Sequence, residues 1–246
     1  SDGKKAVANT NGIEIIGLSK ENIVSNNLIS GNKADGIFIH DVTVADYKSK
    51  TLIYGNLIGI ASDGITNLPN NNGITINGSS QNEIGNLTNA LNIISGNLSN
   101  GIVISGLHSI NNTIRRNRIG TDSNGILPVP NKLNGILINN SSTKTIIEYN
   151  HIAGNTLSGI SITSLGRTES AYTGECEIAN NFIGTDAEAK KSLPNFENGI
   201  TIYLATDNIL HDNVLSGNGK NGVYIEGLSA DKVVPLKNSI YKNKIG

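Results

Sequence analysis

The 246-residue chain contains no tryptophan and no methionine, and aromatic residues make up only 4% of it. Its single cysteine, Cys176, excludes an internal disulfide, and we expect it to occupy an ordinary position of the repeat described below. No apolar run approaches the roughly 18 residues of a membrane span. The formal charge of −1 and an isoelectric point near 6.4 argue against nucleic acid or an anionic membrane as a partner.

Two residue types dominate what is present. Asparagine occurs 38 times and isoleucine 37 times, together almost a third of the chain. Isoleucine is β-branched and therefore suits pleated sheets better than helices, and no stretch shows a convincing 3.6-residue period. The chain also carries neither a signal peptide nor an initiator methionine, so we expect it to be a processed or excised piece of a longer protein.

A short motif occurs eight times: a small polar residue, glycine, isoleucine or valine, any residue, then isoleucine. Its glycines are Gly12, Gly36, Gly73, Gly101, Gly135, Gly159, Gly199 and Gly222. The alternation of apolar residues predicts a strand with two aliphatic side chains inward and a variable one outward. We expect the glycine and asparagine residues to allow the left-handed backbone where each coil bends.

A second motif follows each copy of the first: asparagine, any residue, then an aliphatic residue. Its asparagines are Asn27, Asn56, Asn92, Asn117, Asn150, Asn181, Asn213 and Asn243. A third aliphatic position precedes these asparagines, at Ile23, Ile53, Ile114, Ile147, Ile178, Ile209 and Ile240; in the third coil an insertion separates Ile84 from Asn92. Each unit therefore holds three short strands.

The eight units alternate in length. Short returns of five residues, such as Gly31 to Gly36, alternate with three long returns: Gly59 to Gly73, Gly120 to Gly135 and Gly184 to Gly199. The repeating unit is thus a double coil. We expect one β-helix segment over residues 1–246, divided at about 12–72, 73–134, 135–198 and 199–246, belonging to a longer chain.

A single coil buries too little apolar surface to offset its loss of backbone entropy, so the coils must stack. Stacking hydrogen-bonds each strand to its neighbours and places isoleucine on isoleucine. The asparagine of each second motif then predicts an inward ladder of amides that bond to one another and to the turn backbone. The predicted fold is all-β: a right-handed single-stranded parallel β-helix of about eight coils with three strands each.

The strings Asn-Arg-Ile-Gly-Thr-Asp at 117–122 and Asn-Phe-Ile-Gly-Thr-Asp at 181–186 resemble the repeats of large bacterial right-handed parallel β-helix proteins. Those proteins belong to the pectate-lyase-like superfamily, and the similarity extends over essentially the whole chain. The resemblance implies a secreted or cell-surface protein that acts on, or adheres to, polysaccharide or other surfaces.

Catalysis on this fold would require titratable groups that converge on the outward face. The outward residues of the first strand, Glu14, Phe38, Thr75, Val103, Leu137, Ser161, Thr201 and Tyr224, offer no pair of this kind. The best catalytic candidates are His40 and Asp41, with Asp46 and Lys48 in the insertion that follows; the alternative is a solvated loop.

Three further groups of residues could form binding sites: recurring acids, clustered basic residues and a pair of tyrosines. Recurring acids start the long returns, but one calcium ion cannot bridge coils two apart, so we expect them to cap the loops; they are Asp2, Asp63, Asp122 and Asp186. We expect basic residues to form a solvated face, at Arg115, Arg116 and Arg118 and at Lys237, Lys242 and Lys244. Tyr203 and Tyr224 lie in adjacent coils and could form a small aromatic patch for sugar.

These observations lead to an interpretation that leans away from an enzyme: a non-catalytic extracellular or cell-surface scaffold, such as an adhesin stalk, a surface-layer element or a fibre segment. No catalytic, metal or cofactor residue is assigned. The alternative is a polysaccharide lyase, epimerase or hydrolase. The partners expected are a second copy stacked head to tail, flanking repeats of the parent chain, or polysaccharide, with no nucleic acid.

Overall fold

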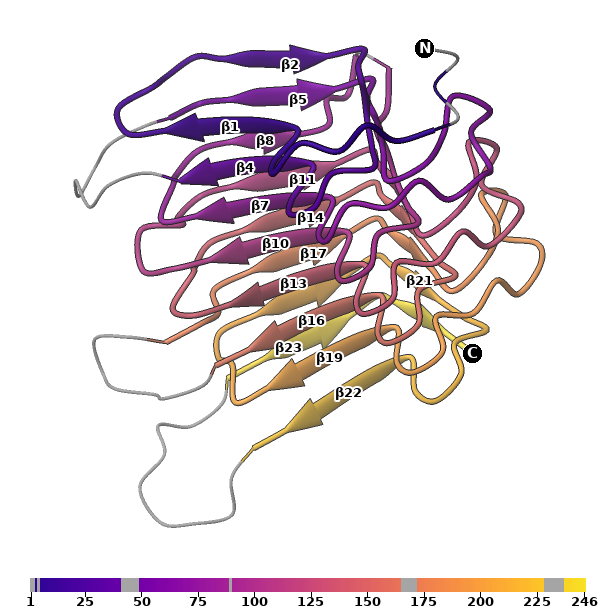
Figure 1. The fold of residues 1–246 in the computed structure, drawn as a ribbon. Helices are drawn as coiled ribbons and strands as arrows, with labels where there is room; N and C mark the ends of the chain where they lie inside the picture. The colour runs from indigo at the N-terminus through magenta and orange to yellow at the C-terminus, as the bar shows by residue number, and fades with distance from the viewer. Residues whose placement is uncertain (1–2, 4, 41–48, 89, 165–171, 228–236) are drawn as a thin grey trace.

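A computed structural model describes residues 3, 5–40, 49–88, 90–164, 172–227 and 237–246. Their regular structure is 24 short β-strands in three eight-stranded sheets, all paired in parallel (Figure 1). None of these residues forms a helix that is long and apolar enough to cross a membrane. The chain is a right-handed parallel β-helix of eight coils, as the repeats predict.

Each coil contributes one strand to each sheet. The first sheet contains β1 (Ile13–Ile16), β4 (Ile37–His40), β7 (Ile74–Asn77), β10 (Ile102–Ser105), β13 (Ile136–Asn139), β16 (Ile160–Thr163), β19 (Ile200–Tyr203) and β22 (Val223–Glu226). The second contains β2 (Ile23–Ser25), β5 (Leu52–Tyr54), β8 (Glu83–Ile84), β11 (Thr113–Arg115), β14 (Ile146–Glu148), β17 (Glu177–Ala179), β20 (Ile209–His211) and β23 (Ser239–Tyr241). The third contains β3 (Leu28–Ile29), β6 (Leu57–Ile58), β9 (Ile93–Ile94), β12 (Arg118–Ile119), β15 (His151–Ile152), β18 (Phe182–Ile183), β21 (Val214–Leu215) and β24 (Lys244–Ile245).

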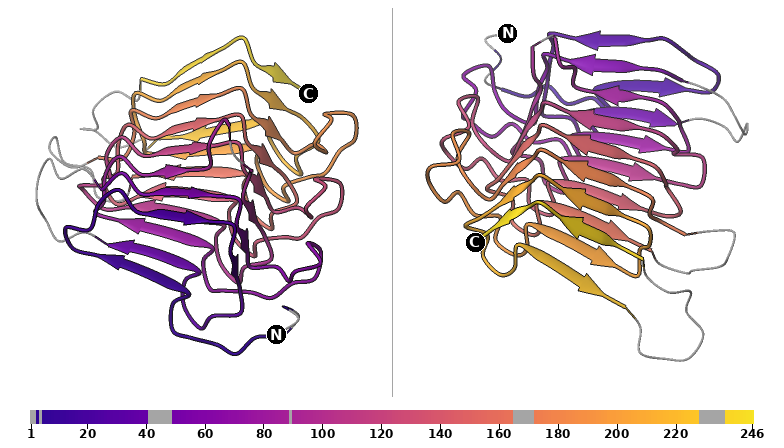
Figure 2. Two further views of the ribbon diagram at one scale, coloured as in Figure 1. Left: turned by 90° about the horizontal axis from the view of Figure 1, so that it is seen from above. Right: turned by 180° about the vertical axis from the view of Figure 1, so that it is seen from behind.

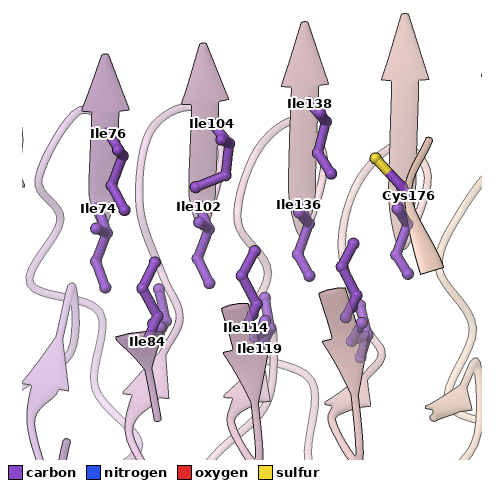
Figure 3. Close-up of a cluster of buried hydrophobic side chains, with 14 of the residues drawn as sticks. Ile74, Ile76, Ile84, Ile102, Ile104, Ile114, Ile119, Ile136, Ile138 and Cys176 are labelled. Carbon is purple, nitrogen blue, oxygen red and sulfur yellow. The ribbon is translucent and has the colours of Figure 1, made fainter. Parts of the chain in front are cut away.

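The core consists of columns of isoleucine. Ile13 pairs with Ile37, and Ile37 pairs with Ile74, so these residues stack in one sheet as expected. Figure 3 shows the same relationship further along the rod, where Ile74, Ile102 and Ile136 repeat from strand to strand. Cys176 lies fully inside this core, consistent with an ordinary repeat position.

In the second sheet, two of the aliphatic positions identified in the sequence lie on the outer face rather than in the core. Ile23 and Ile209 are 66% and 41% exposed, whereas their successors Val24 and Leu210 are buried. The register pairs Val24 with Ile53, and a strand's side chains alternate between faces, so Ile23 must point outward. Two adjacent aliphatic residues hide this choice in the sequence.

The predicted asparagine ladder is present at the turn between the second and third sheets. Each side-chain amide donates to the Oδ1 atom of the next asparagine, from Asn27 to Asn243, over 2.8–3.1 Å. A second ladder runs along the returns from Asn32 to Asn218, with amide-to-amide distances of 2.8–3.2 Å. The ladders satisfy amides that would be costly to bury without partners.

Glycine is required in the first motif for a different reason from the one expected. Gly36 is absent from the residues with positive φ, so it is not needed for a left-handed bend. A Cβ atom at Gly36 would lie 2.6 Å from the carbonyl oxygen of Gly73. Close approach between coils therefore requires glycine here, whereas Gly120, after the second motif, does adopt a left-handed φ of 90°.

The long returns fold back over the outer face of the third sheet. Antiparallel bridges such as Thr121–Pro128 and Thr185–Ser192 make each return a small hairpin. Ile60 and Val129, from two returns, pack with Ile93 of β9 in a separate apolar cluster. The returns gather on one side of the rod (Figures 1 and 2), which leaves the outer faces of the first and second sheets open for a site.

Candidate functional site

The outer face of the first sheet has two rows of side chains. Each strand extends one residue beyond the isoleucine motif, and that residue also faces outward. In this second row, Ile16, His40 and Asn77 are paired neighbours, and so are Tyr203 and Glu226. The first row contains no pair of charged groups, as expected, whereas the second row brings Glu226 beside the residues of the first.

Three titratable groups on this face lie together in the last two coils. Tyr224, which is 39% exposed, donates its hydroxyl hydrogen to Glu226 Oε2 over 2.8 Å. Tyr203 pairs with Glu226 across β19 and β22 and acts electrostatically on Tyr224. Tyr203, Tyr224 and Glu226 thus form a small group on two neighbouring strands.

A hollow of about 480 Å³ lies beside this group, over the starts of β16, β19 and β22. Ser161, Thr201 and Tyr224 project from the strands into it, and Glu197 and Lys220 line its edge. Lys220 Nζ lies 2.8 Å from Glu197 Oε1. The volume falls within the range of about 300–1,000 Å³ that is typical of small-ligand sites.

Tyr224 and Glu226 interact electrostatically beside the hollow. The hydrogen bond to Glu226, together with the charge of that carboxylate, raises the pKa of the Tyr224 phenol. The phenol donates its hydrogen to Glu226 Oε2, which accepts it. A carboxylate and the hydroxyl that holds it in place therefore lie within a single strand.

His40, the leading catalytic candidate from the sequence, lies at the far end of the same face. Its ring stacks on Phe38 with the centroids 5.7 Å apart. Its Nδ1 atom is buried and has no hydrogen-bond partner among the described residues. Asp41, Asp46 and Lys48 lie outside the described residues.

The second sheet carries a charged group that was not predicted from the sequence. His211 Nε2 lies 3.1 Å from Glu177 Oε1, and its Nδ1 lies 2.8 Å from Asp212 Oδ2. The ring also stacks on Tyr241, with 5.2 Å between centroids. Hydrogen bonds to Asp212 and then Glu177 raise the pKa of His211. Because both ring nitrogens face carboxylates, this group has the form of a surface ion-pair network. The sequence does contain an indication of this group: Glu177 and His211 each lie next to the buried aliphatic residue of their strand, β17 or β20.

The acidic residues of the long returns cap their loops, as expected. Asp63 Oδ1 accepts hydrogen bonds from the backbone of Ile65 and Thr66, at 3.0 and 2.9 Å. Asp122 binds the backbone of its own loop in the same way, and so does Asp186. Asp2 lies outside the described residues. Within the described ranges, no group of three His, Cys, Asp or Glu side chains is arranged to hold a metal ion.

The three arginines of the fourth coil do not form one basic patch. Arg115 faces outward from the second sheet between Glu83 and Glu148, at 3.5 and 3.3 Å. Arg116 occupies the following turn and donates to the carbonyl oxygen of Leu87. Arg118 lies in the third sheet and donates to the carbonyl oxygen of Ser123 in the long return. Although these arginines are close in sequence, the turn between the second and third sheets directs their side chains to different places.

Comparison with known proteins found no matching family model and no matching curated protein. Solved structures do match. A mutant of the periplasmic alginate epimerase AlgG superposes with a TM-score of 0.67 at 18% identity, covering 95% of this chain and 47% of that one. The A-module of the Azotobacter vinelandii mannuronan C-5 epimerase AlgE6 superposes with a TM-score of 0.50 at 16% identity, covering 90% of this chain and 57% of that one.

At these identities the likeness establishes the parallel β-helix fold alone. The chain spans about half the length of the epimerase structures that it matches. These neighbours are nevertheless enzymes, and the first sheet does carry a cluster of titratable side chains. The interpretation that leaned away from an enzyme is therefore corrected: the balance of the findings favours one.

Proposed function

We propose that this chain forms the catalytic β-helix of a polysaccharide-acting enzyme, and that it moves a proton at C-5 of a uronate residue. The observation that carries the proposal is the 2.8 Å hydrogen bond between Tyr224 and Glu226 beside a hollow bordered by Lys220. The fold shared with alginate and mannuronan epimerases supports the choice of substrate class.

Epimerisation at C-5 removes a proton beside a carboxylate and returns a proton from the opposite face of the ring. This chemistry needs a proton acceptor, a proton donor and a positive group that offsets the negative charge developing on the carboxylate. Glu226, beside the hollow, supplies the acceptor, Tyr224 holds that carboxylate through its hydrogen bond, and Lys220 in the hollow supplies the cation. Tyr224 and Glu226 lie on the same side of the ring, so the proton that returns from the opposite face comes from solvent water. The location that suits this activity is the periplasm or the cell exterior, where such polysaccharides occur.

The test is deuterium exchange. Polymannuronate is incubated with the protein in D₂O, and incorporation at C-5 is followed by NMR together with the change in uronate composition. We expect Glu226→Gln to lower the rate of exchange by about 10²–10⁴-fold, which is typical of losing a general base. Tyr224→Phe keeps that base and should lower the rate less.

Tyr241→Phe is the matched control, because Tyr241 lies in the second sheet of the same coil as Tyr224 and faces away from the hollow. We expect it to retain the full rate. Formation of unsaturated products in place of deuterated polymer would assign a lyase instead of an epimerase. No exchange with any uronate polymer, or full activity of Tyr224→Phe, would contradict the proposal.

A further inference from the structure

A second hollow, of about 520 Å³, lies on the side of the rod that carries the long returns. Pro128 and Pro130 of the second long return form one wall, and Pro194 and Phe196 of the third form the other. The short return at Gly154 to Thr156 lies between them. Since proline fixes its own backbone torsion, the walls are rigid before any ligand arrives.

The backbone behind these walls is held by the second asparagine ladder. Asn155 donates its amide to Asn195 Oδ1 over 2.9 Å, and both side chains are buried. The backbone nitrogen of Phe196 donates to the carbonyl oxygen of Asn155 over 2.9 Å. The hollow is thus part of the ladder-stabilised rod rather than a gap between loose loops.

Phe196 is the unusual residue of this hollow. Its ring is 71% exposed, which removes any role in packing the core. The matching positions after Pro69-Asn70 and Pro130-Asn131 hold Asn71 and Lys132, so an aromatic ring is not a feature of the repeat. An exposed aromatic ring beside prolines, in a concave and mostly apolar site, is the usual form of a ligand-binding surface.

The two hollows are adjacent, because Lys220 lines both of them. Phe196 and Thr156 line the hollow between the long returns. Their sequence neighbours Glu197 and Leu157 line the hollow beside Tyr224. A ligand that extends from one hollow into the other would cross the rod along the direction of a coil. Lys220 carries the only charge among the residues that line the hollow of Phe196, so the charge at the junction suits an anionic ligand.

We propose that the hollow between the long returns is a second binding subsite for an anionic sugar chain, one that holds a ring beyond the reacting residue. The apolar face of the sugar ring packs on Phe196 and the prolines. The carboxylate of the sugar replaces Glu197 as the ion-pair partner of Lys220. That ion pair is about half exposed, and such pairs contribute little to stability, so the exchange of partners costs little. This assignment takes only the class of substrate from the proposed function.

The experiment measures binding by calorimetry in the Glu226→Gln background, which lacks the proposed base and leaves the lining of both hollows unchanged, with mannuronate hexamer as the probe. We expect Phe196→Ala to weaken binding roughly tenfold, as fits the loss of a buried ring face. Phe196→Trp should bind like the parent because it keeps an aromatic face. The matched control is Leu127→Ala, an exposed apolar residue of the second long return that does not line the hollow.

The outcomes separate this inference from the proposed function. Unchanged binding by Phe196→Ala, with Glu226→Gln still slowing exchange in the otherwise unaltered protein, would overturn the subsite alone. Weakened binding by Phe196→Ala, without any exchange by the unaltered protein, would support the subsite and contradict the catalytic proposal. Tighter binding of a neutral glucan hexamer or of a proline-rich peptide than of the mannuronate hexamer would overturn the subsite.

Discussion

His151 donates from Nε2 to the carbonyl oxygen of Thr185 over 2.6 Å, and this contact joins the outer face of the third sheet to the third long return. The donor must carry the hydrogen, so the neutral ring leaves Nδ1 without one, and Nδ1 is buried with no partner among the described residues. Burial lowers the pKa of His151, and the charge of Arg118 lowers it further.

We predict that His151 makes the protein less stable in acid. A histidine whose folded pKa lies below its ordinary value of 6.5 contributes stability that is complete above that pH. This stability is lost as the pH falls through the folded pKa, because the unfolded chain binds the proton more readily. The free energy of unfolding in urea should decrease from pH 7 to pH 5, and less so in His151→Gln. An NMR titration that places the pKa of His151 above 6.5 would disprove this.

The opposite dependence is expected at His211. Its pKa is raised by Asp212 and Glu177, so its contribution to stability is complete below pH 6.5 and is lost as the pH rises through the folded pKa. Glu177→Gln should lower the pKa of His211 in an NMR titration of the ring protons. Glu148→Gln serves as the control, because Glu148 lies on the same face but pairs with Arg115. Equal titration curves for the two variants would refute the assigned cause.

The asparagine ladder should have a large effect on stability. Asn150 donates to the carbonyl oxygen of Ile114 over 2.9 Å and to Asn181 Oδ1 over 3.1 Å, and it accepts from Asn117. Asn150→Ala leaves several buried groups without partners and should cost about 3 kcal/mol of unfolding free energy. Asn124→Ala, at an exposed position, should change it by less than about 0.5 kcal/mol. Similar melting curves for both variants would exclude the ladder as a main source of stability.

The thiol of Cys176 should be inert in the folded protein. Burial raises its pKa to about 12. Because the thiolate is the reactive form, an aromatic disulfide reagent should modify the native protein very slowly and the urea-unfolded protein within the mixing time. Rapid labelling under native conditions would show that the core opens at this coil.

The sequence alone determined the β-helix, because its cause is local and repeated. Ile13, Ile37 and Ile74 recur with the same neighbours, and such residues bury their side chains only by stacking in register. Asn117 and Asn150 likewise mark a turn that every coil needs, so the first ladder could be predicted. Loop capping by Asp122 followed from the same repetition.

Tertiary structure decided whatever depends on which coils and faces meet. The sequence could not choose between Ile23 and Val24 as the inward residue, since only pairing with Ile53 sets the face. Tyr203 and Glu226 are 23 positions apart and become neighbours because one whole coil separates them. The hollows at Lys220 arise from returns of unequal length, whose relative positions no local pattern encodes. Repetition along a chain specifies a rod, but the chemistry on its surface depends on the residues that break the repetition and on the contacts that stacking gives them.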